Sequence, residues 1–339
     1  MRMPDIVFFS SPIGLGHASR DIAISQHLGN ISKRFVSGSA AAKLITGHGF
    51  EADDLYKPPP FQIKNGKLQD PLRWLFKYYS YYKECKKISS RVLEKSQPHI
   101  IISDEDFASL VVAKERGIKT VLVTDILETK FAKGIGSLIE KKMNQSMRNI
   151  IQKCNLVIIP ENGENENNIA RVGPIVRKTA YSRQQLREIF SFTKKTVIVS
   201  AGGTDAGKFL IEKALQVFEK MNLDAELVVV SGPILNVSTS KARNLGFVNN
   251  LHEIIFAADL VISLAGRSTI DESMHYGTPG IFIPIKGHFE QEENAKQIGF
   301  IYDDIFRLDG LISEKINEGR KPLPCNGAEK AVDLIRSLL

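Results

Sequence analysis

Three stretches of the sequence share one pattern, in which an apolar run is followed by a glycine turn and the start of a helix-like segment. They are Gly14–His17, residues 200–207 (SAGGTDAG) and residues 263–269 (SLAGRST). Unpaired N–H groups at a helix N-terminus carry partial positive charge and bind phosphate, and glycine lets a ligand approach the backbone. The pattern therefore predicts three candidate phosphate sites. The candidate residues are Gly14, Gly16, Gly203, Thr204, Gly266, Arg267, Ser268 and Thr269.

The first of these loops also contains a histidine. Gly14-Leu15-Gly16 does not complete a dinucleotide-binding fingerprint, because Ser19 stands where glycine or alanine is required. His17 stands where the helix would begin, and there the helix dipole disfavours the imidazolium and lowers its pKa. Since a neutral imidazole is a suitable general base, we interpret His17 as a candidate base. A histidine that caps the helix or packs locally is the alternative.

The apolar pattern predicts the elements that would position these loops. Nearly continuous apolar runs, typical of parallel strands buried on both faces, alternate with longer helical segments. The polar residues 161–178 interrupt this alternation and resemble a linker. We expect an α/β fold with two doubly wound, Rossmann-like domains facing each other across a cleft, residues 1–160 and 179–320, and a closing helix within 321–339. The expected strands are Ile6–Phe9, Arg34–Ser37, His99–Ser103, Thr120–Thr124, Leu156–Pro160, Thr196–Ser200, Glu226–Ser231, Asp259–Ser263 and Gly280–Pro284.

Composition and charge narrow the class of protein. The 339 residues are 43% hydrophobic and 24% charged, as in soluble globular proteins. No apolar run approaches the roughly 20 residues that span a bilayer, and the N-terminus shows no signal peptide. The three cysteines are widely spaced and suggest neither disulfides nor zinc, so we expect a cytoplasmic protein. Net charge is +9 over residues 1–160 and −2 over residues 161–339, which indicates either an anionic partner for the first domain or a solubilising face.

Residues 245–295 contain the most specific pattern in the chain. They read LGFVNNLHEIIFAADLVISLAGRSTIDESMHYGTPGIFIPIKGHFEQEENA, so that an apolar strand precedes a glycine turn, T-x-x-E, G-T-P, a second apolar strand and E-Q-x-x-N-A. This order resembles the donor-binding half of the MurG-type glycosyltransferases, which add N-acetylglucosamine to a lipid-linked peptidoglycan precursor. It also resembles related GT-B enzymes that use UDP-sugars. The resemblance covers most of the second domain and, more loosely, the His17 loop.

The resemblance implies a role for each matching residue. Glu272 would accept both ribose hydroxyls, because the two oxygens of a carboxylate suit a vicinal diol. The other implied roles are Phe247 and Val248 in the uracil pocket, Thr204 and Gly266–Ser268 at the diphosphate, Arg177 at the phosphates, and Glu290 and Gln291 at the sugar hydroxyls.

Several of these residues have plainer interpretations. Thr269-x-x-Glu272 also reads as a capping box, in which Glu272 would only cap its helix. Phe247 could belong to the core, and Glu290 and Gln291 could be solvated helix residues. The MurG type has two glutamines where this chain has Glu290 and Gln291, and its first loop is richer in glycine, which leaves the sugar and the acceptor open.

The implied reaction moves a sugar, N-acetylglucosamine or a similar one, from a UDP-sugar to a lipid-linked or glycan acceptor with inversion. His17 would deprotonate the acceptor hydroxyl, and helix N-termini would stabilise the diphosphate, so that neither a metal nor another cofactor is expected. Asp104-Glu105-Asp106 follows a predicted strand, and a D-x-D can also hold a divalent ion. We assign Asp104 to orienting His17 or an acceptor hydroxyl, with N-capping of the next helix as the alternative.

Residues 74–95 mix aromatic residues with lysines at helical spacing. Such a surface suits anionic lipid headgroups, and it would place the enzyme peripherally on the inner face of the plasma membrane. Nucleic acid could also stack there, and an ordinary amphipathic helix is the plain alternative. The sequence is also compatible with two other functions. One is a nucleotide-sugar hydrolase, whose G-x-G-H-x-x-R loop is matched from Gly14 to Arg20. The more distant one is a basic nucleic-acid-binding protein, although no recognised motif supports nucleic acid as a partner.

Overall fold

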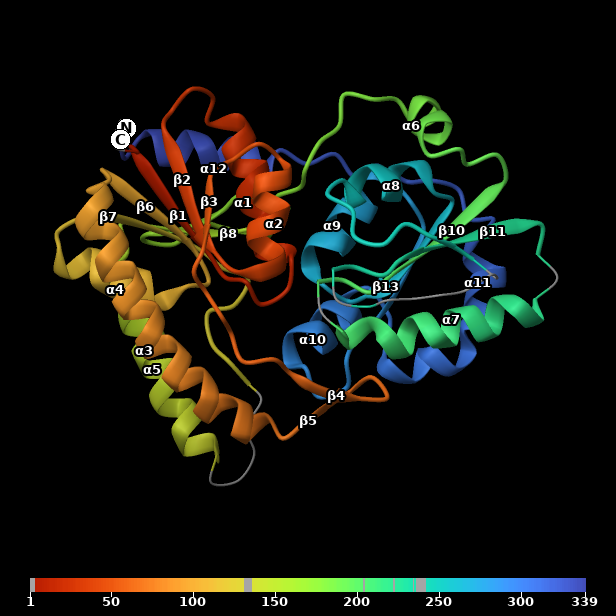
Figure 1. Cartoon of the computed structure of the whole chain (residues 1–339), viewed down its shortest axis with the longest axis horizontal. Helices are drawn as coiled ribbons and strands as arrows, with labels where there is room; N and C mark the ends of the chain where they lie inside the picture. The colour runs from red at the N-terminus through yellow and green to blue at the C-terminus, as the bar shows by residue number, and fades with distance from the viewer. Residues whose placement is uncertain (1–3, 131–135, 204, 222, 234, 236–241) are drawn as a thin grey trace. The chain divides into compact units, whose positions relative to one another are not determined.

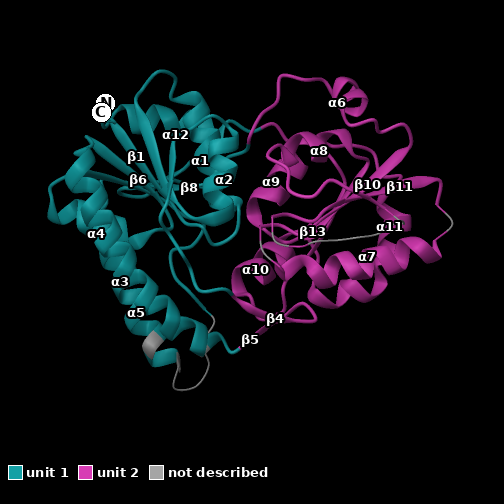
Figure 2. Cartoon of the chain, viewed as in Figure 1, with its two compact units in different colours: residues 1–60, 70–176, 325–339 teal, residues 61–69, 177–324 magenta. Residues whose placement is uncertain are grey.

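The computed structural model describes residues 4–130, 136–203, 205–221, 223–233, 235 and 242–339. The chain divides into two compact units (Figure 2). Unit 1 comprises Met1–Pro60, Asp70–Val176 and Cys325–Leu339, and unit 2 comprises Phe61–Gln69 and Arg177–Pro324. Each unit contains its own parallel sheet, as the expected α/β fold requires.

Unit 1 is built on a seven-stranded parallel sheet with the order β3-β2-β1-β6-β7-β8-β9 (Figure 1). The strands are β1 Ile6–Ser10, β2 Lys33–Ser37, β3 Ala52–Asp54, β6 Ile100–Asp104, β7 Lys119–Val123, β8 Leu156–Ile159 and β9 Ile169–Arg171. The helices are α1 Gly16–His27, α2 Ser39–Gly47, α3 Pro71–Ser96, α4 Phe107–Glu115, α5 Gly136–Lys153 and α12 Gly327–Arg336.

The central strands of unit 1 are buried on both faces, which explains their nearly continuous apolar sequence. Val7 and Phe9 of β1 join a core cluster with residues of α3, α4 and α5. Alternate residues point to the opposite face, where Phe8 stacks on Phe35 with 4.6 Å between ring centroids. Because β1, β6 and β7 run parallel, their carboxyl ends meet at one edge of the sheet, where ligands bind in such folds.

Unit 2 contains a five-stranded parallel sheet with the order β12-β11-β10-β13-β14. The strands are β10 Lys195–Ser200, β11 Ala225–Val230, β12 Arg243–Asn244, β13 Leu260–Leu264 and β14 Gly280–Ile283. The helices are α6 Arg183–Ile189, α7 Lys208–Lys220, α8 Leu251–Ala257, α9 Arg267–Tyr276, α10 Phe289–Gln297 and α11 Leu308–Lys315, with 3-10 turns η1 Asp205–Gly207 and η2 Tyr302–Arg307.

An antiparallel hairpin, β4 Gln62–Lys64 and β5 Lys67–Gln69, also belongs to unit 2, although its sequence interrupts unit 1. The Tyr302 hydroxyl donates to the Asn65 carbonyl at 2.6 Å, and the Leu68 N–H donates to the Lys286 carbonyl at 2.9 Å. These contacts attach the hairpin to the segments around η2 and α10.

The nine expected strands are present, each with ends within one residue of those predicted. The expected domain limits differ from the two units in three places. The stretch expected as a linker, residues 161–178, contains β9, and the change of unit falls after Val176. The C-terminal helix α12 packs on α1 and so belongs to unit 1, and the β4–β5 hairpin belongs to unit 2. Among the described helices, none combines the length and apolar character needed to cross a bilayer.

Candidate active site

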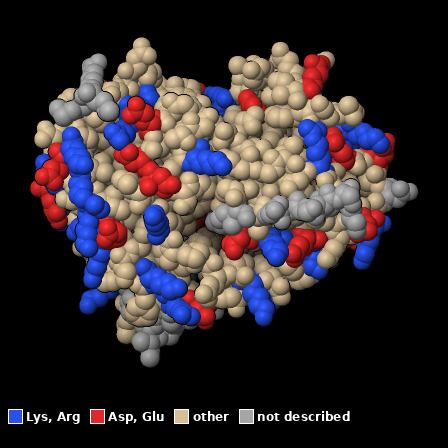
Figure 3. Space-filling view, viewed as in Figure 1, with Lys and Arg blue, Asp and Glu red and all other residues tan. Residues whose placement is uncertain are grey.

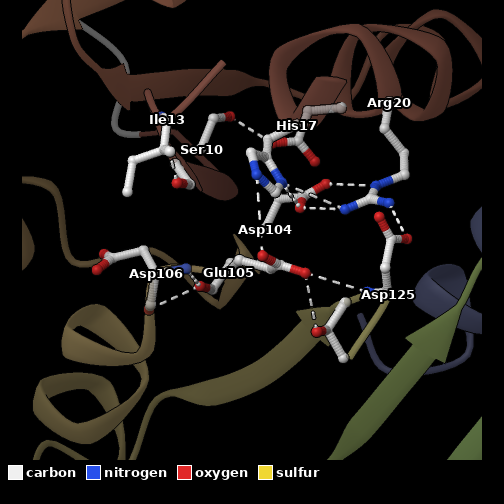
Figure 4. Close-up of polar contacts among 12 residues, drawn as sticks. Ser10, Ile13, His17, Arg20, Asp104, Glu105, Asp106 and Asp125 are labelled. Atoms are coloured by element: carbon white, nitrogen blue, oxygen red, sulfur yellow. Dashed lines mark hydrogen bonds and ion pairs between the residues drawn. The ribbon is translucent and has the colours of Figure 1, made fainter. Parts of the chain in front are cut away.

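Charged side chains meet at the carboxyl ends of β1, β6 and β7 in unit 1 (Figure 4). The last residue of β1, Ser10, pairs in register with the last residue of β6, Asp104. Beyond Ser10 the chain turns at Gly14, whose φ of +85° lies in the left-handed region that glycine adopts without strain. The turn leads into α1, and His17 occupies its first turn.

Asp104 holds both His17 and Arg20 of α1. Nδ1 of His17 lies 2.8 Å from Oδ1 of Asp104, so the predicted contact between these two residues is present. Arg20 donates to Asp104 through Nε at 2.8 Å and Nη2 at 2.6 Å, and its Nη1 donates to Asp125. The side chains of Arg20, Asp104 and Asp125 are largely buried, so each charge requires a partner of opposite charge in place of water. A carboxylate at Nδ1 selects the tautomer with Nδ1–H and directs Nε2 away from Asp104.

The electrostatics of His17 differ from the expectation. Burial disfavours the imidazolium, but the carboxylates of Glu105 and Asp104 outweigh burial and raise the pKa of His17 to about 9. The predicted lowering by the helix dipole is therefore wrong, because full charges nearby exceed the partial charge of a helix terminus. Burial also opposes ionisation of Asp104, yet Arg20 and His17 hold the pKa of Asp104 below its usual value.

Glu105 is a member of this cluster for which the sequence pattern indicated no role of its own. Its Oε1 accepts hydrogen bonds from the Thr124 hydroxyl and the Asp125 N–H, each at 3.1 Å. Its Oε2 lies 3.8 Å from Nε2 of His17. Asp125 was likewise missed as a site residue, and Arg20 was noted only as the last position of the G-x-G-H-x-x-R loop. Their place in the sequence could have indicated them, since polar residues at the carboxyl ends of parallel strands gather at one edge of a sheet.

Asp104 and Asp106 point to different surroundings (Figure 4). Asp106 caps α4, accepting from the N–H groups of Ala108 and Ser109 at 3.3 Å each, and it also accepts from the Tyr56 hydroxyl at 2.7 Å. For Asp106 the N-capping alternative is therefore confirmed. Among the described residues, no group of three or more His, Cys, Asp and Glu side chains is arranged to hold a metal ion.

In unit 2 the first glycine loop follows β10. Gly202 has a φ of +75°, which strains any other residue, and a Cβ at Gly232 would lie 2.4 Å from the Gly202 carbonyl oxygen, so a larger residue at Gly232 would clash. Gly207 is equally constrained, because a Cβ there would lie 2.3 Å from Cα of Ala201. Gly203 lies in the turn of this loop, and the predicted diphosphate ligand Thr204 falls outside the described residues. The close approach to Ala201 explains Gly207 without reference to a ligand.

The second glycine turn of unit 2 precedes α9. Gly266 is the N-cap of this helix, and Ser268 and Thr269 lie in its first turn, where backbone N–H groups lack intrahelical partners. Arg267 pairs with Asp271 through Nε at 3.0 Å, one turn along the helix. The capping-box interpretation of Thr269-x-x-Glu272 is wrong, because α9 begins two residues before Thr269.

Glu272 forms a buried ion pair with Arg177. The Nε of Arg177 donates to Oε1 of Glu272 at 2.8 Å and Nη2 donates to Oε2 at 3.2 Å, while Nη1 donates to the Asn249 carbonyl at 2.9 Å. Both side chains are 3% exposed. The Arg177 guanidinium is therefore directed to the carboxylate that neutralises it, and its implied phosphate contact stays a prediction. Each Glu272 oxygen retains acceptor capacity, so the implied ribose contact stays a prediction.

The remaining implied donor residues lie on α10 and before α8. Glu290 and Gln291 occupy the first turn of α10, where Oε1 of Gln291 accepts from the Ile285 N–H at 3.1 Å. Phe247 and Val248 are half-buried, and Val248 packs against the unit 2 core. The structure therefore gives Gln291 a local backbone contact in addition to its implied sugar contact.

Comparisons with known proteins show which glycosyltransferases the chain is similar to. Residues 196–300 match the glycosyltransferase family 28 C-terminal domain. An uncharacterized glycosyltransferase of Methanopyrus kandleri is 24% identical over 220 residues, which cover 61% of this chain and 63% of that relative. The UDP-N-acetylglucosamine–N-acetylmuramyl-(pentapeptide) pyrophosphoryl-undecaprenol N-acetylglucosamine transferase of Thermosipho africanus is 23% identical over 316 residues, which cover 85% of this chain and 84% of that enzyme.

Solved structures support the fold. The glycotransferase of kitacinnamycin superposes with a TM-score of 0.69 at 15% sequence identity, and the superposition covers 100% of both chains. The calicheamicin glycosyltransferase CalG4 superposes with a TM-score of 0.64 at 14% identity, covering 100% of this chain and 99% of that one. The chain therefore has the fold of the GT-B glycosyltransferases, and residues 196–300 of its second unit match the family 28 C-terminal domain.

Proposed function

We propose that this glycosyltransferase transfers N-acetylglucosamine or a similar sugar from a UDP-sugar to a hydroxyl of a lipid-linked or glycan acceptor, with inversion and without a metal ion. The observation that carries the proposal is the family 28 match over residues 196–300, which includes the two glycine loops of unit 2, α9 and α10. The Thermosipho africanus relative is named for transfer from UDP-N-acetylglucosamine to a lipid-linked acceptor, which supports this substrate class.

Unit 2 would bind the donor. In this proposal Glu272 accepts the ribose hydroxyls while Arg177 holds the carboxylate in place, so Arg177 acts through Glu272. The N-terminus of α9 would bind the diphosphate, because its first N–H groups and the helix dipole favour an anion. Glu290 and Gln291 would contact the sugar from the first turn of α10.

Unit 1 would activate the acceptor. Asp104 holds His17 through Nδ1, so Nε2 is the ring atom available to an acceptor hydroxyl. Arg20 keeps Asp104 ionised, which fixes the ring in this orientation. Together they would place an acceptor hydroxyl for attack on the anomeric carbon of the donor sugar.

The surface of helix α3 is the observation that supports two parts of the proposal, the lipid-linked acceptor and peripheral binding to an anionic membrane. Trp74 and Tyr81 face inward, where the Trp74 indole donates to the Pro59 carbonyl at 2.9 Å. Phe76 and Tyr79 are 67% and 60% exposed, and Lys83 lies 4.4 Å from the centre of the Tyr79 ring. Lys and Arg side chains gather along the edge of unit 1 where α3 and α4 lie (Figure 3). Exposed aromatic rings among basic residues suit lipid headgroups.

A nucleotide panel tests the donor assignment. Thermal melting is recorded with UDP, GDP, ADP and dTDP, and we expect UDP to stabilise the protein most strongly, by about 2.7 kcal/mol at 100-fold excess over Kd. Glu272→Gln should weaken the effect of UDP several-fold, whereas Glu253→Gln, a matched change on the neighbouring helix α8, should leave it unchanged. Equal stabilisation by all four nucleotides, or none by UDP, would contradict the donor assignment.

A further inference from the structure

We propose that Glu105 takes the proton from the acceptor hydroxyl, which binds between Oε2 of Glu105 and Nε2 of His17. This inference rests on the proposed transferase function and adds to it the atom that receives the proton. It follows from the backbone of Glu105, from the use of its two carboxylate oxygens and from the separation between Oε2 and the imidazole.

The backbone of Glu105 is strained in a way that the surrounding structure maintains. Its φ of +57° lies in the left-handed region, which is unfavourable for a side chain such as glutamate. Its N–H donates to the Val123 carbonyl at 3.2 Å, so the strained residue is tied to the end of β7. Strain of this kind persists only where neighbouring contacts enforce it, and it is concentrated at functional sites. Here it directs the carboxylate toward His17 (Figure 4).

The two carboxylate oxygens of Glu105 have different surroundings. Oε1 is held by the Thr124 hydroxyl and the Asp125 N–H. Oε2 faces Nε2 of His17 at 3.8 Å, which is too long for a direct hydrogen bond. One oxygen atom can lie about 2.8 Å from both of these atoms, which is the usual hydrogen-bond distance. A hydroxyl oxygen at that position would bridge the two atoms by hydrogen bonds.

Accessibility separates Glu105 from the other carboxylates of the cluster. Asp104 is fully buried and binds His17 and Arg20, and Asp125 binds Arg20. The side chains of Glu105 and His17 are 14% and 13% exposed, so a ligand can reach them. Burial raises the pKa of Glu105, although the charge of His17 opposes this effect, and a raised pKa makes the carboxylate a better proton acceptor.

These positions define the bonds that form and break in the transfer step. Nε2–H of His17 donates a hydrogen bond to the acceptor oxygen and fixes its place. The acceptor oxygen forms a bond to the anomeric carbon of the donor sugar while its proton moves to Oε2 of Glu105. The bond from the anomeric carbon to the diphosphate oxygen breaks, and its electron pair leaves with UDP. The carboxylic acid of Glu105 afterwards returns the proton to water.

Glu105→Gln separates the chemical role from a structural one. The amide oxygen of glutamine can still accept from Thr124 and Asp125, so a residue that merely holds this loop would tolerate the change. A proton acceptor would not, because the amide nitrogen that replaces Oε2 accepts no proton. We expect kcat to fall by roughly 10²–10⁴-fold, with KM for UDP-N-acetylglucosamine, UDP binding and the melting temperature nearly unchanged. Glu115→Gln, an exposed carboxylate of α4, is the matched control and should retain full activity.

A second variant tests the same atom in another way. Glu105→Gly removes the carboxylate and relieves the left-handed strain, so folding should not suffer. We expect formate, which supplies a small carboxylate, to restore part of the lost turnover of Glu105→Gly and none of that of Glu105→Gln. The assay follows UDP release and labelled product from UDP-N-acetylglucosamine with a panel of polyprenyl-diphosphate-linked sugars.

The outcomes are distinguishable. If the wild type transfers sugar and Glu105→Gln does so at a similar rate, the inference is overturned while the transferase function stands. If Glu105→Gln loses UDP binding together with turnover, Glu105 has no specific part in proton transfer. If the wild type neither transfers sugar nor releases UDP with any member of the panel, the proposed function fails and this step fails with it.

Discussion

The charge of His17 should make the stability of the protein depend on pH in a defined window. The pKa of His17 is raised from 6.5 to about 9 in the folded chain by Glu105 and Asp104, against the opposing effects of burial and of Arg20. A pKa raised on folding stabilises the protein below the unfolded value, and this stability is lost as pH rises through the folded value. The two values differ by an amount that corresponds to about 3 kcal/mol. At 13% exposure the side chain is mostly shielded from solvent, so little of this is lost to screening.

Urea denaturation of the wild type and of His17→Gln at pH 6 and pH 10 measures this contribution. We expect the wild type to exceed the variant by about 3 kcal/mol at pH 6 and by much less at pH 10, because the imidazolium of His17 is present in the folded wild type at pH 6 and has lost its proton at pH 10. His99→Gln, which changes a histidine with 74% exposure, serves as the control and should show little difference at either pH. A difference between wild type and His17→Gln that is the same at both pH values would refute the proposed charge state of His17.

Three further predictions follow from the structure. Arg177→Met should lower the free energy of unfolding by about 3–5 kcal/mol, since it leaves the Glu272 carboxylate buried without its partner. In a thermal melt, the double variant Arg177→Met with Glu272→Leu should recover most of the lost stability, and a single variant as stable as the wild type would contradict this expectation. Turnover should be unchanged in EDTA, because helix N-termini are proposed to hold the diphosphate, and activity lost on chelation and restored by Mn²⁺ would contradict it. The protein should sediment with anionic vesicles more than with neutral ones, salt and Phe76→Ser should both reduce this binding, and equal binding to both kinds of vesicle would contradict the electrostatic part of the proposal.

The sheets were predictable from the sequence because their pattern is local. Runs such as Ile6–Phe9 and Leu156–Ile159 are apolar throughout, and burial on both faces of a parallel sheet is what such runs indicate. Short strands lack this signal. The β3 strand has the sequence Ala-Asp-Asp and β9 lies in a polar stretch, so pairing with a longer neighbour creates both of them. The place of α12 in unit 1 also depends on tertiary packing, here against α1.

In the site, too, the features that depend on neighbouring residues in sequence were predictable, and those that depend on tertiary contacts were not. His17 stands out because a glycine turn and a helix start surround it in sequence. The contact of Asp104 with His17 was predictable because Asp104 ends β6, His17 follows β1, and these two strands pair in one parallel sheet. The left-handed backbone of Glu105 and its contact with Thr124 depend on β6 and β7 lying side by side, which no local pattern encodes. The pairing of Arg177 with Glu272 joins residues 95 positions apart, so no local pattern indicates it.

The most direct test of the central claim is transfer of a labelled sugar. Purified protein is incubated with UDP-N-acetylglucosamine that carries the label in the sugar, together with polyprenyl-diphosphate-linked sugar acceptors in detergent, and the label is counted in the lipid fraction and as free sugar. We predict that label enters the lipid fraction in step with UDP release, and that the NMR spectrum of the product shows an inverted anomeric centre. Label recovered only as free N-acetylglucosamine would identify a hydrolase, and unchanged UDP-sugar across the acceptors would contradict the account.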